Sequence, residues 1–197
     1  MQEKRRTNIQ RSEATRSMLV AAARRLFIAH GYADTSTPDI SEEAGVSRGA
    51  LYHQFADKRA LFEAVITSEA EAVAWEIERA TPEHNNGNAH LITGAQAYLQ
   101  AMGKEGRCRL LLVDGPTVLG PAQMRSIDGQ SGATTLVNGL REIAPGADID
   151  RLAASADLLS AAFDRAALAI DQGGAKDVYE AAVIELIETV AERLSAD

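Results

Sequence analysis

The 197-residue sequence has little of what several protein classes require. Its single cysteine, Cys108, excludes an intramolecular disulfide framework and a zinc site built only from cysteines. Prolines are scarce, and the abundant alanines favour helix over sheet. No apolar run reaches the roughly 18 residues of a membrane span, and no apolar stretch follows the basic residues at the N-terminus. We therefore expect a cytoplasmic protein without a secretory signal and without contact to a membrane.

The residues that are present are those of a globular protein, with 46% hydrophobic and 24% charged side chains. The net charge is −8, but it is unevenly distributed. The first 60 residues hold ten basic and seven acidic side chains, which gives +3 there and leaves −11 for the rest. Because the local field decides whether a polyanion binds, a basic N-terminal part suits a small nucleic-acid-binding module. An excess of three charges also lies within ordinary scatter.

Helices are predicted close to the N-terminus. Apolar residues recur at helical spacing over 12–30, where Ser12 is a suitable N-cap and Gly31 a suitable residue to end the helix. Thr37 is the expected N-cap of a second helix over 38–44, because a proline follows at the first helical position.

A third helix is predicted over 48–55, with Ser47 as its N-cap. A glycine turn at Gly45 separates it from the second helix, and two short helices joined in this way form a helix-turn-helix. Gly49 and Ala50 carry almost no side chain, so this helix could lie close to the floor of a DNA groove. Its outer side carries the hydrogen-bonding residues Arg48, Tyr52, His53 and Gln54. A plain helical hairpin with a polar face is the alternative.

The segment 31–62 resembles the DNA-binding signature of the TetR/AcrR (tetracycline-repressor-like) transcription regulators. It contains, in the order and spacing of that family, the motifs DI at 39–40, AGVS at 44–47, LYHQF at 51–55 and DK at 57–58. The resemblance covers about residues 12–66, and the rest of the chain resembles the family in being helical and in its length. Pro38 and Gln54 depart from the family's pattern, which bears on the preferred DNA sequence.

The resemblance implies a set of DNA-contacting residues. They are Ser36, Thr37, Ser47, Arg48, Gly49, Ala50, Tyr52, His53 and Lys58. In the family, the loop before the second helix and the lysine after the third contact phosphates, so Lys58 is expected to anchor a phosphate. Arg48 is the best candidate for a base contact, because its planar guanidinium matches the edge of guanine.

The all-α fold predicted for the chain has two parts, a helix-turn-helix domain over 1–56 and a helical effector-binding and dimerisation domain over 57–197. Helices in the second part are expected at 57–80, 89–103, 108–114, 121–143, 150–171 and 175–195. A polar loop at 83–88 and a break at Gly115-Pro116 separate some of them.

The two C-terminal helices, about 150–171 and 175–195, are unusually apolar. Such broad apolar surfaces need more than one neighbouring helix. They form either the internal core of one monomer or a two-fold four-helix bundle between two chains, which resembles the family's dimer interface. A homodimer would suit a pseudo-palindromic operator with half-sites spaced by about one helical turn.

The family resemblance also implies a pocket for a small effector between the helices of the second part. Candidate lining residues are Trp75, Tyr98, Leu111, Met124, Leu136 and Phe163. Their apolar character favours a hydrophobic effector, although each also suits plain core packing.

No catalytic constellation is visible, and we expect neither a metal nor a cofactor. The four histidines are dispersed, and His84 and His90 are six positions apart, which does not place them on one helix face. Cys108 is expected to be packed inside rather than to act in redox chemistry. The favoured function is a ligand-responsive transcriptional repressor. The alternative is a small helical enzyme or lipid-binding protein whose basic N-terminus is incidental.

Overall fold

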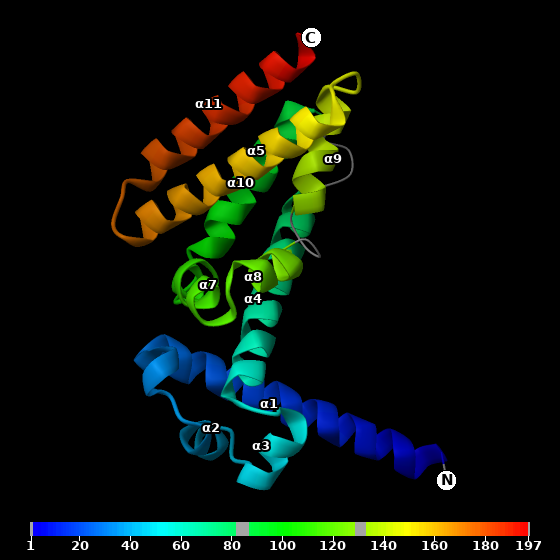
Figure 1. Ribbon diagram of the computed structural model, residues 1–197, viewed down its shortest axis with the longest axis vertical. Coiled ribbons are helices and arrows are strands. Elements are labelled where there is room, and N and C mark those ends of the chain that lie inside the picture. The colour runs from blue at the N-terminus through cyan, green and yellow to red at the C-terminus, as the bar shows by residue number, and fades with distance from the viewer. Residues whose placement is uncertain (1, 82–86, 129–132, 197) are drawn as a thin grey trace.

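The protein is described by a computed structural model that covers residues 2–81, 87–128 and 133–196. Within these ranges every regular element is a helix, which confirms the predicted all-α class (Figure 1). The first helices are α1 (Gln2–Asp34), α2 (Thr37–Glu43), α3 (Arg48–Gln54) and α4 (Lys58–Ala80). They are followed by α5 (Asn88–Met102), α6 (Arg107–Arg109), a π-helical turn (Leu110–Asp114), α7 (Gly115–Leu119), α8 (Pro121–Asp128), α9 (Ala133–Ile143), α10 (Ile149–Asp171) and α11 (Lys176–Ser195). Over the same ranges, no helix has both the length and the apolar character needed to cross a membrane.

Two of the short N-terminal connections end in the capping side chains that the sequence supplies. The Ser47 Oγ accepts a hydrogen bond from the backbone N–H of Ala50 at 3.2 Å, and the Asp57 carboxylate accepts one from that of Ala60 at 2.7 Å. Each bond satisfies a donor in the first turn of a helix that has no partner within the helix. The predicted starts of α3 and α4 are therefore confirmed.

Two details of the N-terminal prediction are wrong. The N-cap of α2 is Ser36 rather than Thr37, because Ser36 forms a reciprocal capping box with the third residue of the helix. Helix α1 begins at Gln2, so Ser12 lies inside the helix and does not cap it. The predicted helix end is confirmed at Gly31, where the backbone turns to a φ of +82°, a conformation that glycine adopts without steric cost.

Aromatic side chains form the centre of the N-terminal core. Phe27 and Tyr32 of α1 meet Phe62 of α4, with ring centroids 4.9 to 5.8 Å apart. Ile40 of α2 and Leu51 of α3 are fully buried in the same core. Because α3 buries Leu51, its opposite face is directed away from the core.

The helical run after α5 differs from the prediction. A break was expected at Gly115-Pro116, but Gly115 has helical dihedral angles (φ −55°, ψ −60°). The preceding turn is π-helical, and Pro116 follows at the start of α7, where its missing N–H removes no essential bond. The run ends at Gly120, with a φ of +87°. The helix predicted over 121–143 corresponds to α8 and α9.

Some of the predicted features fall outside the residues that the structure describes. These are the part of the predicted helix over 129–132 and most of the loop predicted at 83–88.

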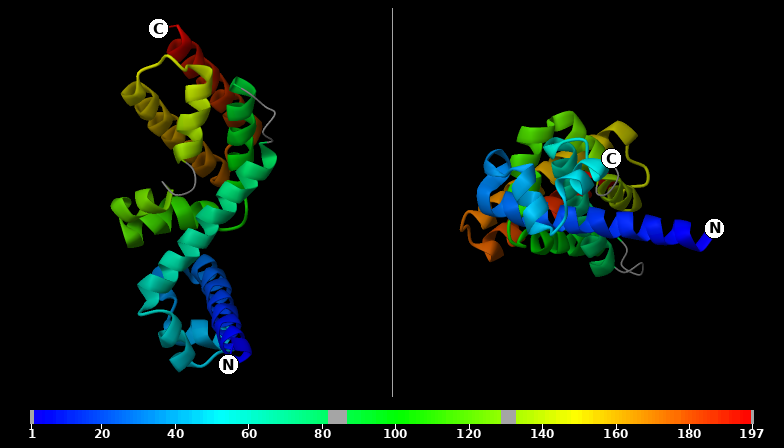
Figure 2. Two further views of the ribbon diagram at one scale, coloured as in Figure 1. Left: turned by 90° about the vertical axis from the view of Figure 1, so that its right-hand side faces the viewer. Right: turned by 90° about the horizontal axis from the view of Figure 1, so that it is seen from below.

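Helix α4 joins the two ends of the molecule (Figure 2). Its 23 residues correspond to a rod of about 35 Å. It packs against α1 in the N-terminal part and against α5 in the C-terminal part. A change in the tilt of α4 would therefore move α2 and α3 relative to the C-terminal helices.

A cluster of buried ionic groups lies where α1, α4 and α6 meet. Glu69, only 7% exposed, accepts hydrogen bonds from Arg24 at 2.8 Å and from Arg107 at 2.9 Å. Arg107, only 5% exposed, also donates to the Glu76 carboxylate at 3.1 Å and to the Ala101 carbonyl at 2.9 Å. Sequence patterns did not reveal this cluster, because Glu69 is 45 positions from Arg24 and 38 from Arg107.

We expect Glu69→Gln to lower the free energy of unfolding by about 2 kcal/mol at neutral pH, because two arginines lose their charged partner in a largely buried site. Burial alone would raise the pKa of Glu69, but the hydrogen bonds and charges of Arg24 and Arg107 outweigh it and lower that pKa. A carboxylate with a lowered pKa stabilises the fold above its unfolded-state pKa and loses this contribution as the pH falls through the folded-state value. The difference between the two proteins should therefore shrink in acid.

Urea unfolding at several pH values measures both effects. The control is Glu71→Gln, an exposed position in the same helix. Equal losses in the two variants, or a difference that does not change with pH, would contradict the role given to Glu69.

The last two helices form an antiparallel pair (Figure 1). Each buries one face against the rest of the chain. The buried residues include Leu152, Ala156, Leu159 and Phe163 in α10, and Val183, Ile187, Ala191 and Leu194 in α11. Each helix also exposes small or apolar residues at helical spacing, which together we call the exposed apolar face. Its members are Ala154, Leu158 and Ala161 in α10, and Val178, Ala182 and Leu186 in α11. Leu158 is 71% and Val178 61% exposed.

Candidate nucleic-acid interface

Helices α2 and α3 lie at the end of the molecule that is opposite to α10 and α11 (Figures 1 and 2). The outer surface of α3 carries exposed polar groups from several of the residues predicted to contact DNA. Ser47, Arg48, Gly49, Tyr52 and His53 are exposed. Ala50 is half-buried. Since Leu51 is fully buried beneath them, the helix presents this polar surface outward without losing its contact to the core.

A hydrogen bond joins the start of α2 to the outer surface of α3. The hydroxyl groups of Thr37 and Tyr52 lie 3.1 Å apart, and the Tyr52 side chain is otherwise 56% exposed. The predicted loop residue Thr37 and the predicted aromatic residue Tyr52 therefore belong to one continuous surface.

Ser36 is engaged in capping α2. Its Oγ donates to the Asp39 carboxylate at 2.6 Å and accepts from the Asp39 backbone N–H at 3.3 Å. The hydrogen bonds from the Ser36 side chain and backbone lower the pKa of Asp39. Asp39 was not singled out as a functional residue, although its place three residues after a serine is a recognisable capping signal.

The far side of α3 is tied to α1 by two contacts that the sequence did not predict. The Gln54 side-chain amide donates to Ser12 Oγ at 2.8 Å. The Arg16 guanidinium lies 4.4 Å from the ring centroid of Phe55, in cation–π geometry. Gln54, one of the two departures from the family pattern, thus packs inward against α1 and fixes the orientation of α3.

Lys58, the predicted phosphate anchor, has partners within the chain. Its ammonium donates to the backbone carbonyls of Tyr32 at 2.8 Å, Ala33 at 3.3 Å and Thr35 at 2.9 Å. It also lies 4.4 Å from the centroid of the Tyr32 ring. This side chain consequently holds together the end of α1 and the loop that leads into α2.

The residues predicted to line an effector pocket do not share one environment. Trp75 is 56% exposed and lies beneath the Arg79 guanidinium at 4.6 Å, so its predicted place in an interior pocket of this chain is wrong. Tyr98 and Phe163 are neighbours, with ring centroids 6.3 Å apart, and the Tyr98 hydroxyl donates to Asp164.

The remaining pocket candidates belong to the packed interior. Leu111 is buried, while Met124 and Leu136 are half-buried against the core. The largest groove found over the described residues, about 800 Å³, lies elsewhere, between α1 and α4. None of the six candidates lines it.

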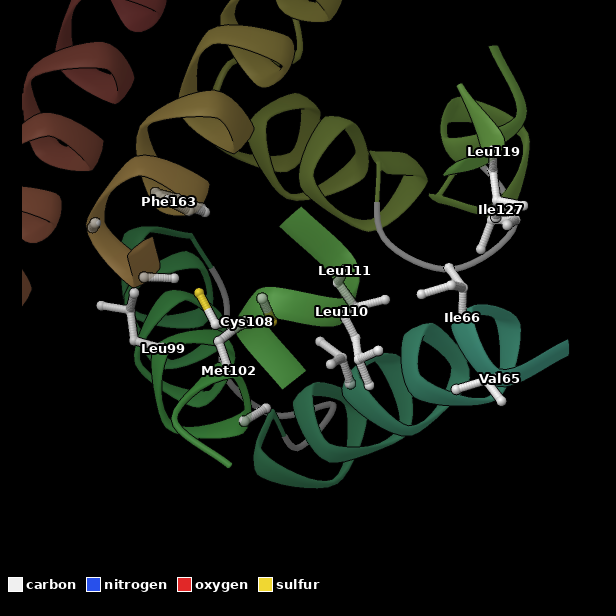
Figure 3. Packing of buried hydrophobic residues seen from close by; sticks show 14 of the residues in the cluster. Val65, Ile66, Leu99, Met102, Cys108, Leu110, Leu111, Leu119, Ile127 and Phe163 are labelled. Atoms are coloured by element: carbon white, nitrogen blue, oxygen red, sulfur yellow. The ribbon is translucent and has the colours of Figure 1, made fainter. Parts of the chain in front are cut away.

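Cys108 is buried, as predicted, and packs among Leu99, Met102 and Phe163 (Figure 3). Burial, together with the negative charges of Asp171 and Asp164, raises the pKa of its thiol to about 11. The thiol is therefore protonated at neutral pH, and its place in the interior is that of a small apolar side chain.

Comparisons with known proteins match both parts of the chain. The family described as "Bacterial regulatory proteins, tetR family" matches residues 19–65. The family described as "Tetracyclin repressor-like, C-terminal domain" matches residues 89–194, which is more than half of the chain.

Curated relatives match only in the N-terminal part. The transcriptional regulator TtgR from Pseudomonas putida is 42% identical over 57 residues, or 29% of this chain and 27% of the relative. The transcriptional repressor AcnR from Corynebacterium glutamicum is 38% identical over 60 residues, or 30% of this chain and 32% of the relative. The chain thus matches about a third of the length of these relatives, or less.

Solved structures match over nearly the whole chain. A TetR-family transcriptional regulator from Pectobacterium atrosepticum is 28% identical, with a TM-score of 0.69 over 94% of this chain and 96% of the other. A TetR-family regulator from Streptomyces coelicolor is 20% identical, with a TM-score of 0.73 over 93% and 97%. At such low identity the second match concerns the fold alone.

Proposed function

The chain belongs to the TetR family of bacterial regulatory proteins, and on this premise we propose that it is a DNA-binding transcriptional repressor that acts as a homodimer. The single observation that carries the proposal is the outer surface of α3, which is polar, exposed and joined to the start of α2 through Thr37 and Tyr52. We assign it no catalytic activity. Its place of action is the cytoplasm, where the DNA of a bacterium lies.

We propose that residues 1–56 form the DNA-binding domain and residues 57–197 the effector-binding and dimerisation domain. Arg48 would contact base edges, since a guanidinium can donate two hydrogen bonds to guanine. Thr37, Tyr52 and His53 would contact phosphates or the groove edge. Gly49 and Ala50 would allow the helix to approach closely, while Ser36 and Ser47 would present helix starts, whose N–H groups favour phosphate.

The homodimer would form through the exposed apolar face of α10 and α11. Large apolar side chains such as Leu158 and Val178 are costly to leave in water, and a two-fold axis would bring two copies of this face together. Two protomers would then present two copies of α3 to successive half-sites of one duplex, about 34 Å or a multiple of it apart.

A small hydrophobic effector bound in the helical body would release the protein from DNA. Tyr98, Phe163 and Leu111 are the candidates for contact with it, and the Tyr98–Asp164 hydrogen bond supplies a polar group among apolar neighbours. An effector shifts the population only by binding one arrangement of the two domains better than the other.

The test is selection of duplexes from a random library by the purified protein, followed by titration at several salt concentrations. We expect an inverted repeat, and an affinity that falls steeply as salt rises. Failure to enrich any duplex would contradict the proposal and favour the alternative of a helical enzyme or lipid-binding protein. Enrichment of a site without two-fold symmetry would contradict the homodimer.

A further inference from the structure

We propose that Lys58 is a positioning residue of the DNA-binding surface, which holds the loop before α2 in place through backbone carbonyls and does not contact a phosphate. This inference rests on the proposed DNA-binding function. It differs from the role that the sequence resemblance implies for this lysine.

The position of Lys58 in its own helix needs an explanation. Lys58 is the first residue of α4, directly after the N-cap Asp57. The N-terminus of a helix carries a partial positive charge, so a cation at this place is unfavourable for α4 itself. The compensation comes from the neighbouring chain, because the side chain extends to the end of α1 where carbonyl oxygens carry partial negative charge.

The ammonium has no donor left for another partner. An ammonium group has three N–H donors, and three carbonyls, those of Tyr32, Ala33 and Thr35, lie within 3.3 Å of Nζ. The Tyr32 ring, whose centroid is 4.4 Å away, covers a further side of the charge. A phosphate at this place would have to replace at least one of these carbonyls.

The loop that Lys58 holds is the one that supplies the DNA-contacting residues of α2. On its other side, the Thr35 hydroxyl is buried and donates to the carbonyl of Gly31 at 2.8 Å. Residue 35 is therefore fixed through both its side chain and its carbonyl. Ser36 and Thr37 follow directly, and Thr37 bonds to Tyr52 on α3. Loss of the ammonium would release the carbonyls and let this corner of the surface move.

The experiment measures binding of wild type, Lys58→Met and Lys58→Arg to the duplex that the wild type selects, over a range of salt concentrations and well below the melting temperature. We expect Lys58→Met to weaken binding by about tenfold and to leave the slope of log affinity against log salt unchanged. A lost phosphate contact would instead reduce that slope by about 0.9 for each protomer, or about 1.8 for a dimer. Such a reduction would overturn the inference.

Lys58→Arg separates the two roles a second time. A guanidinium binds phosphate at least as well as an ammonium, but its planar fork does not fit three carbonyls that converge on one point. We therefore expect Lys58→Arg to lose affinity as well. Wild-type affinity in this variant would overturn the inference, and so would unchanged binding by Lys58→Met, which would leave the lysine a role in stability alone.

The control is Lys176→Met, which removes the same charge from the half-exposed first turn of α11. It should bind as the wild type does. Failure of the wild type itself to bind any duplex would instead contradict the proposed function, so the two failures are distinguishable.

Discussion

Replacement of Leu158 by glutamate is expected to convert the dimer into monomers and to weaken operator binding by at least about 100-fold. Leu158 is 71% exposed in the single chain, so the substitution should leave the fold of the protomer intact. In the proposed dimer, the two-fold axis would bury two new carboxylates in an apolar interface, where neither has a cationic partner. A monomer would contact one half-site only and lose the contribution of the other.

Light scattering measures the mass, circular dichroism the retention of helix, and a titration with labelled operator the affinity. The matched control is Val113→Glu, which also replaces a large apolar side chain, 47% exposed, but in the π-helical turn away from α10 and α11. It should remain a dimer. A Leu158→Glu protein that stays dimeric would place the interface on another surface of the chain.

Replacement of Arg48 by alanine is expected to weaken binding to the selected operator by at least about 30-fold. Each bidentate contact between an arginine and a guanine contributes about 1–3 kcal/mol of discrimination, and a dimer would lose two of them. Arg48 is exposed and precedes Gly49, so no structural contact in the described part of the chain should be lost with it. The melting temperature should therefore stay unchanged.

Arg48→Lys gives a sharper result than alanine alone. Lysine keeps the charge but lacks the planar fork, so affinity for the operator should fall while non-specific binding to unrelated duplexes is retained. In both variants, discrimination should be relaxed at one base pair of each half-site and kept at the others. The control is Arg141→Ala, which removes the same charge from an exposed place in α9. Uniform weakening on all duplexes would show that Arg48 contacts phosphate instead of a base.

The positions of most helices followed from local sequence. Ser47 and Asp57 cap the helices they were predicted to cap, and Gly31 adopts the positive φ that a helix end there requires. Such features depend on a few neighbouring residues, so short-range chemistry is enough to predict them. Where two capping residues adjoin, as Ser36 and Thr37 do, the choice depends on the third residue of the helix, and the prediction was wrong by one position.

Errors grew where distant contacts decide the outcome. The sequence gave no reason for the helix to continue through Gly115 and Pro116, since both residues normally interrupt one. Trp75 has the composition of a core residue and lies at the surface beneath Arg79. In both cases the local preference was overridden by packing that a periodic pattern does not contain.

By itself, the sequence determined the helical class, the places where the N-terminal helices begin and the polar outer face of α3, because capping and helical periodicity act over three or four residues. Only the tertiary structure decided which charges meet. It brought Glu69 to Arg24 and Arg107, and it turned Lys58 toward three carbonyls of the preceding helix end. Ion pairs and hydrogen bonds of this kind join residues tens of positions apart, and their partners are fixed by the packing of whole helices.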